Sequence, residues 1–548
     1  MTHFRHPGVT IALLLAGALA NAQTIRYVLS AASAGLPGLP NSPIAQGSLL
    51  AIYGSALGVS VGSVHDSFPL VTSLGGASAK VNIGGTDVDL FLTWDSDAQI
   101  NAVLPSSTPV GTGTITVTYN GKSASAPITV VPNNFGIFTV GEQGSGMGVV
   151  VHSDYTLVTP NNAANPGETL IIEGTGLGPV QGDEAAGPLP GNLNVPVQVW
   201  VGTQQTTVSY RGRSAAAAGL DLVKFTVPPG IAGCTVSVAV QIGSMVSNFT
   251  DLAIAEQGAV CSDVGFSTGT ELAALFNSGV LRYGGVTLVR TISEAAPFPG
   301  VPVETTKSDD GQGLFGKFTF WDYLWPTYLI DSSSYGSCSV TEYFGETPSV
   351  FAGLTYTSLD LGPAINISGP DGNRSMSPVS ANGLTGYSAK LGAGTPGNYL
   401  DPGNYTISST GGTDVGPFSV QIVVPPSITW TNEDQISNVT RASGQVVTWT
   451  GGDPNGYVDI TGSSVLLNPD NSAVGASFAC RAFTSAGSFT IPGFVLLSLP
   501  ASANFGGFAL PGVLGISSAS LPKQFTATGL DLGYANSLVT DSKQVIYQ

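Results

Sequence analysis

Short apolar runs that alternate with polar residues follow one another along most of this chain, and Gly, Pro, Asn or Asp separates them. Alternation with a period of two, bounded by such residues, predicts β-strands joined by tight turns. The first predicted strands cover residues 27–33, 79–83, 88–92, 99–104 and 114–119. With the stretch at residues 46–60 they make six segments, close to the seven or so short strands in about 105 residues that predict an immunoglobulin-like β-sandwich.

One stretch occurs twice and sets the organisation of the first half. Residues 46–60 read QGSLLAIYGSALGVS and residues 166–180 read PGETLIIEGTGLGPV, so that Gly54 and Gly174, like the other shared positions, lie 120 residues apart. Solenoid repeats span about 20 to 50 residues, so this longer period indicates a duplicated domain. The glycines also resemble a phosphate loop. A dinucleotide site needs a helix after them, however, and Pro179 and a polar loop follow instead, so we predict a strand-to-loop turn.

The second half repeats the strand pattern with one helical exception at residues 270–279. Thr270 can cap this helix, Glu271 lies in its first turn and Gly279 ends it. The acidic, glycine-rich residues 308–313 predict a turn. Strands are predicted at residues 286–291, 315–320, 364–368, 386–391, 403–408, 418–424, 445–450, 457–461, 477–482, 488–491 and 494–499.

The chain is therefore predicted to be mostly β, with tandem immunoglobulin-like β-sandwiches followed by further β-rich domains and one short helix. Its 548 residues are enough for about three to five domains. The predicted divisions are a signal peptide at 1–22, sandwich modules at 23–132 and 133–261, a small β-rich domain with the helix at 262–350, and sandwich-like domains at 351–425 and 426–548.

The N-terminal residues have the pattern of a secretion signal. A short polar segment with Arg5 precedes an apolar run at residues 9–18, and Ala20-Asn21-Ala22 is a small-x-small cleavage site. The apolar run is shorter than the roughly 20 residues that span a bilayer, and no later stretch reaches that length without a break. We predict a secreted or cell-surface protein without a transmembrane anchor.

The charge balance disfavours one class of partner. Only 9% of residues are charged, and Lys+Arg 17 against Asp+Glu 35 give a net charge of −18. Removal of residues 1–22 takes away one arginine and no acid, so the mature chain carries 16 − 35 = −19. Such a chain repels nucleic acid, and we predict no nucleic-acid partner.

Four cysteines occur in the mature chain. Cys234 opens one predicted strand and Cys261 follows the next, so an antiparallel hairpin turning near residues 243–246 would bring them together as a disulfide. Cys338 and Cys480 are either a second disulfide or two buried thiols, because the pattern does not determine their pairing.

A set of ordered motifs carries a resemblance to a known family. IAQGSLLAIYGSALG, SLGGASAKVNIGG, AQINAVLP, GIFT, NPGETLIIEGTGLGPV and VSN follow one another between about residues 27 and 254. This order resembles the Solibacter-type uncharacterised domain family of secreted bacterial proteins, which is similar to IPT/TIG immunoglobulin-like modules. The resemblance implies tandem β-sandwiches on an exported protein and brings no catalytic residues with it. That domain is known chiefly as a C-terminal appendage, whereas nearly 300 residues follow it here.

Few residues offer catalytic or metal chemistry. His65 and His152 are the only histidines after residue 22 and lie in different modules, and the chain has no H-E-x-x-H motif. No cofactor is predicted. Calcium is the one alternative, since turn carboxylates offer the hard oxygen ligands that it prefers. Solvated turns, in which an aspartate hydrogen-bonds its own backbone, are the better explanation of these residues. These carboxylates are Asp95, Asp97, Asp309, Asp310, Asp371 and Asp470.

The stretch GLFGKFTFWDYLWPTYL is the most distinctive part of the second half. On a strand, Trp321, Tyr323 and Trp325 would share one face. An exposed row of rings would bind a sugar or a protein groove, whereas burial would make the same rings part of a core.

Three functions follow from these patterns. The first is an extracellular binding, adhesion or scaffold protein, with an extracellular protein or polysaccharide as partner. The second is a secreted polysaccharide-active enzyme with two facing carboxylates in residues 262–548. The third is a carbohydrate-binding protein that uses the aromatic stretch at residues 315–328. No catalytic residue is assigned, and we expect binding rather than catalysis.

Overall fold

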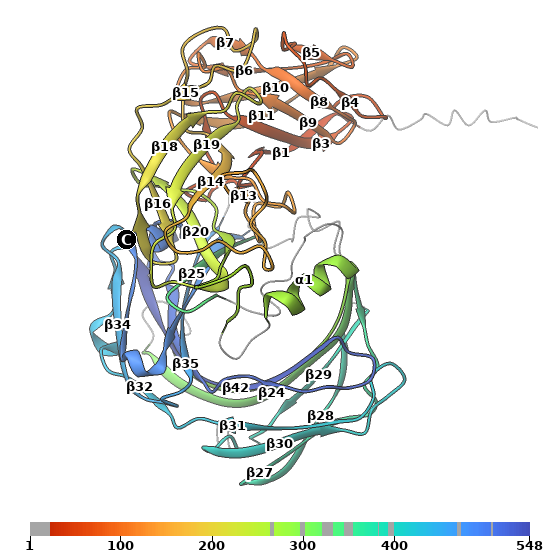
Figure 1. The fold of residues 1–548 in the computed structure, drawn as a ribbon, viewed down its shortest axis with the longest axis vertical. Coiled ribbons are helices and arrows are strands. Elements are labelled where there is room, and N and C mark those ends of the chain that lie inside the picture. Colours follow the sequence, from red (N-terminus) through yellow and green to blue (C-terminus); the bar gives the residue numbers. More distant parts are fainter. Residues whose placement is uncertain are drawn as a thin grey trace, which may run out of the picture.

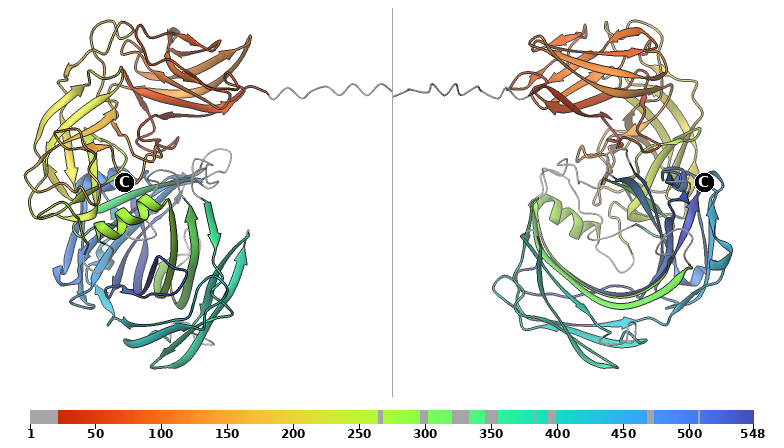
Figure 2. Two further views of the ribbon diagram at one scale, coloured as in Figure 1. Left: turned by 45° about the vertical axis from the view of Figure 1, so that its right-hand side comes forward. Right: turned by 180° about the vertical axis from the view of Figure 1, so that it is seen from behind.

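Two small β-sandwiches lie beside one wide, curved sheet (Figure 1). This computed structural model describes residues 22–263, 268–295, 302–319, 333–344, 355–381, 383–392, 399–467, 473–505 and 508–548. The curved sheet wraps around helix α1 (Gly269–Ser278), which lies on its inner side (Figure 2). The predicted class, mostly β with tandem sandwiches followed by further β-rich structure, is confirmed. No helix among the described residues is long and apolar enough to cross a membrane.

The first sandwich buries one core between two sheets. One sheet has the order β1 (Thr24–Ser30), β3 (Leu49–Ser55), β9 (Gln99–Val103), β8 (Phe91–Asp95) and β4 (Ser63–Val64). The other has the order β2 (Ile44–Ala45), β11 (Lys122–Val131), β10 (Gly111–Tyr119), β6 (Ala77–Ile83) and β5 (Ser73–Leu74), with β7 (Thr86–Asp89) paired to β6. Alternate residues such as Leu50, Ile52 and Val81 fill the space between the sheets.

The second sandwich places the repeated stretch in the same role. One sheet has the order β12 (Gly136–Ile137), β14 (Thr169–Thr175), β19 (Asp221–Thr226), β18 (Val208–Arg213) and β15 (Gly191–Asn192), with β13 (Val150–Val151) on β14. The other has the order β17 (Gln204–Thr206), β16 (Val197–Val201), β20 (Gly233–Ile242) and β21 (Met245–Val246), with β22 (Thr250–Ile254) on β20. The two copies of the stretch form β3 and β14, and each strand is paired on both sides.

The repeated glycine turns meet at a buried polar junction between the sandwiches. The Arg213 guanidinium donates hydrogen bonds to the carbonyls of Gly47 (2.6 Å) and Gly178 (3.0 Å), one from each copy. Its Nε lies 3.3 Å from the Asp221 carboxylate, and both side chains are almost fully buried. That carboxylate also accepts the N–H groups of Gly176 (2.9 Å) and Leu177 (2.8 Å). The glycine turn therefore binds a side chain of its own module, as a structural turn does.

One sheet of 15 strands joins the three segments that the sequence pattern divides at residues 350/351 and 425/426. Its order is β25 (Cys338–Phe344), β36 (Ala473–Phe483), β35 (Tyr457–Leu467), β40 (Gly512–Ala519), β42 (Leu532–Tyr547), β23 (Val280–Ala295), β24 (Glu304–Thr319), β29 (Leu384–Lys390), β28 (Gly372–Ala381), β27 (Ile365–Gly369), β30 (Gly403–Ser409) and β31 (Phe418–Val424). Three more strands pair with members of this path, namely β26 (Thr355–Ser358), β33 (Asn438–Val439) and β41 (Lys523–Gln524). Strand pairing thus connects all three segments.

Smaller elements complete the second half. A sheet of β32 (Ile428–Trp430), β34 (Gln445–Gly451) and β37 (Ser488–Ile491) contributes Trp430, Trp449 and Ile491 to a core shared with β35 and β36. The remaining elements are β38 (Asn504–Phe505), β39 (Phe508–Ala509), α3 (Gly493–Leu497) and the short 3-10 turns η2 (Glu433–Gln435), η3 (Arg441–Ser443) and η4 (Thr484–Ala486).

Two local predictions are wrong. Residues 308–313, predicted as a turn, lie inside the long strand β24, where Arg290 of β23 holds Asp309 through two 2.8 Å hydrogen bonds. Gly311 there gives room for the side chain of Met376, since a Cβ would lie 2.7 Å from its sulfur. Residues 494–499, predicted as a strand, begin as helix α3. A continuous apolar run that is buried on all sides has the same sequence pattern whether it forms a helix or a strand, so periodicity cannot distinguish the two.

Helix α1 forms where it was predicted but has a different cap. Thr268 receives the N–H of Glu271 at 3.3 Å, and the Glu271 carboxylate receives the N–H of Thr268 at 2.8 Å. This reciprocal capping box replaces the predicted cap at Thr270. Gly279 ends the helix with a φ of 64°, as expected. Leu272 packs in the core of the second sandwich, so the helix is held between that module and the sheet.

Both cysteine pairs form disulfides. Cys234 and Cys261 are joined with a Cα–Cα distance of 5.2 Å, because β20 and β22 pair antiparallel as the hairpin argument required. Cys338 and Cys480 are directly opposite each other on β25 and β36 and are also joined, with a Cα–Cα distance of 4.0 Å. The second bridge holds an edge strand of the 15-stranded sheet to its neighbour.

Candidate ligand-binding surface

Small hydroxyl side chains share one face of four neighbouring strands in the 15-stranded sheet. The register places Thr341 of β25 beside Ser477 of β36, Ser477 beside Ser463 of β35, and Ser463 beside Val513 of β40. Directly opposite residues of paired strands point to the same side, so these side chains form one surface. We call it the inner face, because its continuation through β42 and β23 reaches Leu281 and packs with α1.

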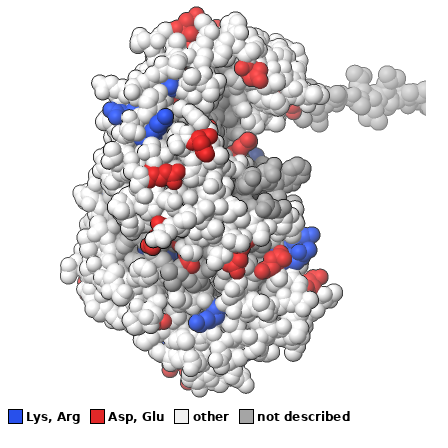
Figure 3. Space-filling model, in the orientation of Figure 1, with Lys and Arg blue, Asp and Glu red and all other residues white. Residues whose placement is uncertain are grey.

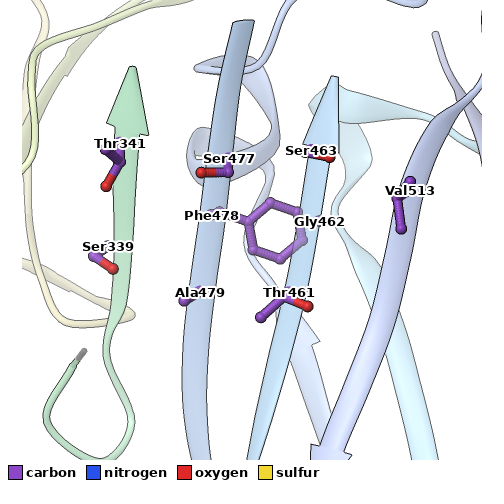
Figure 4. A pocket seen from close by; sticks show the side chains of 9 residues that line it. All are labelled: Ser339, Thr341, Thr461, Gly462, Ser463, Ser477, Phe478, Ala479 and Val513. Atoms are coloured by element: carbon purple, nitrogen blue, oxygen red, sulfur yellow. The ribbon is translucent and has the colours of Figure 1, made fainter. Parts of the chain in front are cut away.

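The inner face is hollowed at this point. The hollow has a volume of about 310 Å³ and opens to solvent. Figure 4 shows its walls, which come from β25, β36, β35 and β40. We call it the hydroxyl hollow. The residues that line it are Ser339, Thr341, Thr461, Gly462, Ser463, Ser477, Phe478, Ala479 and Val513.

The hydroxyl groups of the hollow differ in their hydrogen bonding. Ser339 accepts from Ser333 at 3.1 Å, and Ser463 hydrogen-bonds the Tyr343 hydroxyl. Among the residues that the structure describes, the hydroxyls of Thr341, Thr461 and Ser477 have no hydrogen-bond partner. Each hydroxyl donates one hydrogen bond and accepts others. Three such groups are therefore free to bind solvent or a ligand.

The floor of the hollow is rigid. A Cβ at Gly462 would lie 2.5 Å from Cε1 of Phe478, so only glycine fits above that ring. Phe478 is buried in the core beneath, together with the Cys338–Cys480 disulfide. The backbone of β35 and β36 is hydrogen-bonded to strands on both sides. A site on such strands is held more precisely than one on a loop.

Charged groups near the hollow are paired with each other. Arg481 donates to the Asp459 carboxylate at 2.8 Å (Nε) and 3.1 Å (Nη2), and its guanidinium lies 4.4 Å from the centroid of the Tyr457 ring. Phe483, which is 46% exposed, stacks on Tyr335 with ring centroids 4.0 Å apart. Among the described residues, none that lines the hollow is charged. Charged residues are sparse over the whole view in Figure 3.

The carboxylates considered for calcium do not gather into one site. Asp95 is fully buried in the first sandwich, where removal from water raises its pKa, and Asp309 is paired with Arg290. The Asp310 carboxylate pairs with Lys390 at 2.7 Å. The others are Asp97 and Asp371, both exposed, and Asp470, which lies outside the described residues. No group of three or more His, Cys, Asp or Glu that could hold a metal occurs in the described part of the chain.

The two histidines also stay apart. His65 Nε2 lies 3.0 Å from the Pro69 carbonyl in the first sandwich. His152 in the second lies with Nδ1 2.5 Å from Glu168 and Nε2 3.1 Å from the Asn162 carbonyl. Burial alone would lower the pKa of His152, but the contacts to Glu168 and Asn162 raise it above its ordinary value. Its contacts fix a loop of the module.

A carboxylate group that the sequence pattern did not single out lies on the opposite face of the sheet. Glu433 of η2 interacts with Asp541 of β42 and Glu294 of β23. Burial, together with these negative neighbours, raises the pKa of Glu433 to about 7 and also raises that of Asp541. The ammonium of Lys543 donates to the Glu433 carbonyl at 2.8 Å. No local sequence motif predicts this carboxylate cluster, because its members come from three segments that are far apart in the chain.

The predicted aromatic row, Trp321, Tyr323 and Trp325, lies outside the described residues, so its role stays a prediction. The hydroxyl hollow was missed for a specific reason. Its one sequence signal is the recurrence of Ser and Thr at every second position, as in Thr461 and Ser463. The same recurrence is typical of any solvated strand face.

Comparison with known proteins gives distant matches only. No protein-family model matches the sequence, and no curated protein matches it. Among solved structures, SGBP-B from a complex xyloglucan utilization locus in Bacteroides uniformis is 13% identical, with a TM-score of 0.20, and the match covers 73% of this chain and 97% of that one.

Two further solved structures match with similarly low identity and TM-score. SGBP-B of a Bacteroides ovatus mixed-linkage glucan utilization locus, in complex with a mixed-linkage heptasaccharide, is 11% identical with a TM-score of 0.15, over 84% of this chain and 94% of that one. The extracellular region of plexin A4 is 13% identical with a TM-score of 0.14 over 43% of this chain, and the match spans 19% of plexin A4. With TM-scores this low, the description of the fold rests on the strand pairings given above.

Proposed function

We propose that this protein is an extracellular binding protein whose two sandwich modules hold the 15-stranded sheet in place and whose hydroxyl hollow receives the ligand. The observation that carries the proposal is the hollow itself. Three hydroxyls without a partner among the described residues, on Thr341, Thr461 and Ser477, face an open recess, and the strands of Thr461 and Ser477 are paired on both sides. Concave sites with a few convergent polar groups are the usual places for ligands.

Two features support an extracellular location. All four cysteines are in disulfides, which persist in oxidising compartments. Residues 1–22 carry the pattern of a secretion signal. The adhesion and scaffold roles, and membership of the Solibacter-type family, belong to the same proposal, since each describes an exported protein built from sandwich modules.

Firm attachment of the modules to the sheet supports a scaffold role. Asn41 of the first sandwich donates to Glu342 of β25 at 2.6 Å, and the Leu36 N–H donates to the same carboxylate at 3.0 Å. Trp200 of the second sandwich stacks on Phe494 of α3 with centroids 4.5 Å apart. Because both modules contact the sheet, its inner face has a fixed orientation relative to them.

The test is a binding screen of residues 23–548 against immobilised polysaccharides and extracellular matrix proteins. The whole mature chain is needed, because Ala239, Val246 and Phe249 of the second sandwich complete the core beneath the hollow. We expect saturable retention on at least one ligand class. Retention on none of them would contradict a binding function.

A polysaccharide-active enzyme is the second candidate, and one observation favours it. A carboxyl group with a pKa near 7, such as Glu433, can act as a general acid at neutral pH. Under this alternative, Glu433 would protonate the leaving oxygen and Asp541 would supply the second carboxylate. Release of reducing sugar by the wild type, and its loss in Glu433→Gln, would support the enzyme. Equal release by both proteins would exclude this assignment.

A further inference from the structure

We infer that the hydroxyl hollow binds an uncharged sugar chain, a step that rests on the proposed binding function and names its ligand class. The first argument is the absence of charge. None of the described residues that line the hollow is ionised, and the nearby Arg481 and Asp459 neutralise each other at 2.8 Å. An ionic ligand would lose its water without gaining a counter-charge. The excess of acidic residues over the whole chain disfavours anions further.

The polar groups match the hydroxyls of a sugar. Thr341 and Ser477 are directly opposite each other on adjacent strands, and Thr461 lies diagonally across from Ser477. Sheet geometry therefore places Ser477 about 5 Å from Thr341 and about 8 Å from Thr461, with Thr341 and Thr461 roughly 10 to 12 Å apart, a span that about two sugar rings cover. Each hydroxyl donates and accepts, as sugar hydroxyls do.

The remaining lining suits the C–H faces of a sugar ring. Ala479, Val513 and the Thr methyl groups supply apolar surface beside the hydroxyls. The volume of about 310 Å³ is at the lower end of the range of roughly 300 to 1,000 Å³ for small-molecule sites. It holds one or two residues of a chain, and the opening to solvent lets the chain continue outside.

A bound peptide fits this site less well. Extended peptides bind sheets by adding a strand to a free edge, where backbone groups are unpaired. The hollow lies on a face, and the N–H and C=O groups of β35 and β36 are already paired on both sides. Among the described strands that form the hollow, only β25 at its rim has an unpaired edge, and the backbone groups of that edge lie in the plane of the sheet rather than toward the hollow. The side chains alone, with three free hydroxyls and no charge, offer little that would select a peptide sequence.

The test uses residues 23–548 and affinity electrophoresis in gels that contain a neutral polysaccharide (a β-glucan, a galactomannan or starch) or a charged one (heparin or pectin). The variants are Thr461→Val and Ser477→Ala, which remove a hydroxyl each, and Ser477→Trp, which fills the hollow. Thr116→Val, on an exposed strand of the first sandwich, is the control. Thermal unfolding of every variant checks its fold.

We expect retardation by at least one neutral polysaccharide and none by the charged polymers. Loss of one neutral hydrogen bond should weaken binding about two- to tenfold in Thr461→Val and in Ser477→Ala. Ser477→Trp should abolish binding, and Thr116→Val should leave it unchanged.

The other outcomes distinguish the two proposals. Neutral-glycan binding that Ser477→Trp leaves intact would overturn the hollow as the site while the binding function stands. Binding to charged polymers or to matrix proteins alone would overturn the ligand class and leave that function in place. Failure to bind any of these ligands would refute both.

Discussion

The junction at Arg213 offers the sharpest test of how the sandwiches are held together. Arg213→Met keeps the aliphatic stem and removes the guanidinium. Two charge-assisted hydrogen bonds, to Gly47 and Gly178, are lost, and the carboxylate of Asp221 stays buried without its counter-ion. Removal of one partner from a buried ion pair costs about 3 to 5 kcal/mol, because the remaining charge is uncompensated.

The assay is differential scanning calorimetry of residues 23–548. For a cooperative unit of about 240 residues, each kcal/mol lowers the midpoint by roughly 2 to 4 °C. A loss of about 4 kcal/mol therefore lowers the transition of the two sandwiches by about 8 to 16 °C. Limited proteolysis should cut the variant between the modules at a temperature where the wild type is intact. Lys122→Met, at an exposed hairpin, is the control and should shift nothing.

The double variant Arg213→Met with Asp221→Asn separates charge from packing. The Asn carbonyl still accepts from the N–H groups of Gly176 and Leu177, and no buried charge is left unpaired. We expect it to recover most of the lost stability. A single variant that shifts the midpoint by less than about 2 °C, or a double variant no better than the single, would refute the reasoning.

Three further predictions concern the second half. Glu433→Gln should stabilise the protein at pH 8 and not at pH 4, by about 1 kcal/mol after allowance for solvent screening. The pKa of Glu433 rises from 4.5 to about 7 on folding, so the folding stability that its neutral carboxyl contributes is present below pH 4.5 and is lost as the pH rises through 7. Urea unfolding at both pH values checks this, and equal gains in stability at the two pH values would contradict it. Thr268→Ala should lower the free energy of unfolding by about 1 kcal/mol through loss of the capping box, and the control Thr270→Ala should change it by almost nothing; chemical denaturation measures both. A larger loss in Thr270→Ala than in Thr268→Ala would indicate that Thr270 is the cap, as the sequence pattern predicts. Gly462→Ala should lower the free energy of unfolding by about 1 to 3 kcal/mol, because the added methyl group clashes with the Phe478 ring. An unchanged melting temperature would show that the Phe478 ring can move to accept the methyl group, so that the floor of the hollow is not rigid.

Local patterning predicted many strands closely. β31 and β37 have the predicted bounds, because each alternates cleanly between glycine and proline turns. The equivalence of β3 and β14 followed from the repeat. These features depend on residues close together in the chain, where alternation and turn chemistry act directly.

Sequence patterning did not predict the candidate site, because the alternation is weak at the strand ends that form it. β35 was predicted to stop at residue 461, but it runs to Leu467, and β36 begins at Ala473 rather than at residue 477. The missing parts hold Ser463, Ser464 and Gly475, whose polar or small side chains weaken the alternation. Ser463, which lines the hollow, therefore lies outside the predicted strands, whereas Thr461 and Ser477 lie at their ends. The junction of Arg213 with Gly47, and the pairing of β25 with β36, join segments too distant for any local rule.

The pairing of β23 with β42 determines when the large sheet can form. The two strands run parallel, Ser542 contacts Ile292 250 residues earlier, and β42 lies between β23 and β40. Until β42 has been synthesised, both neighbours present open edges, and such edges invite aggregation. The first sandwich contains all its own strands and its whole core, so it can fold first. The core of the second sandwich also includes Leu281 and Leu532 of the large sheet. If the protein is exported as proposed, we expect the second half to cross as an unfolded chain that completes its sheet only after β42 has crossed. Pulse proteolysis of nascent chains would detect this order.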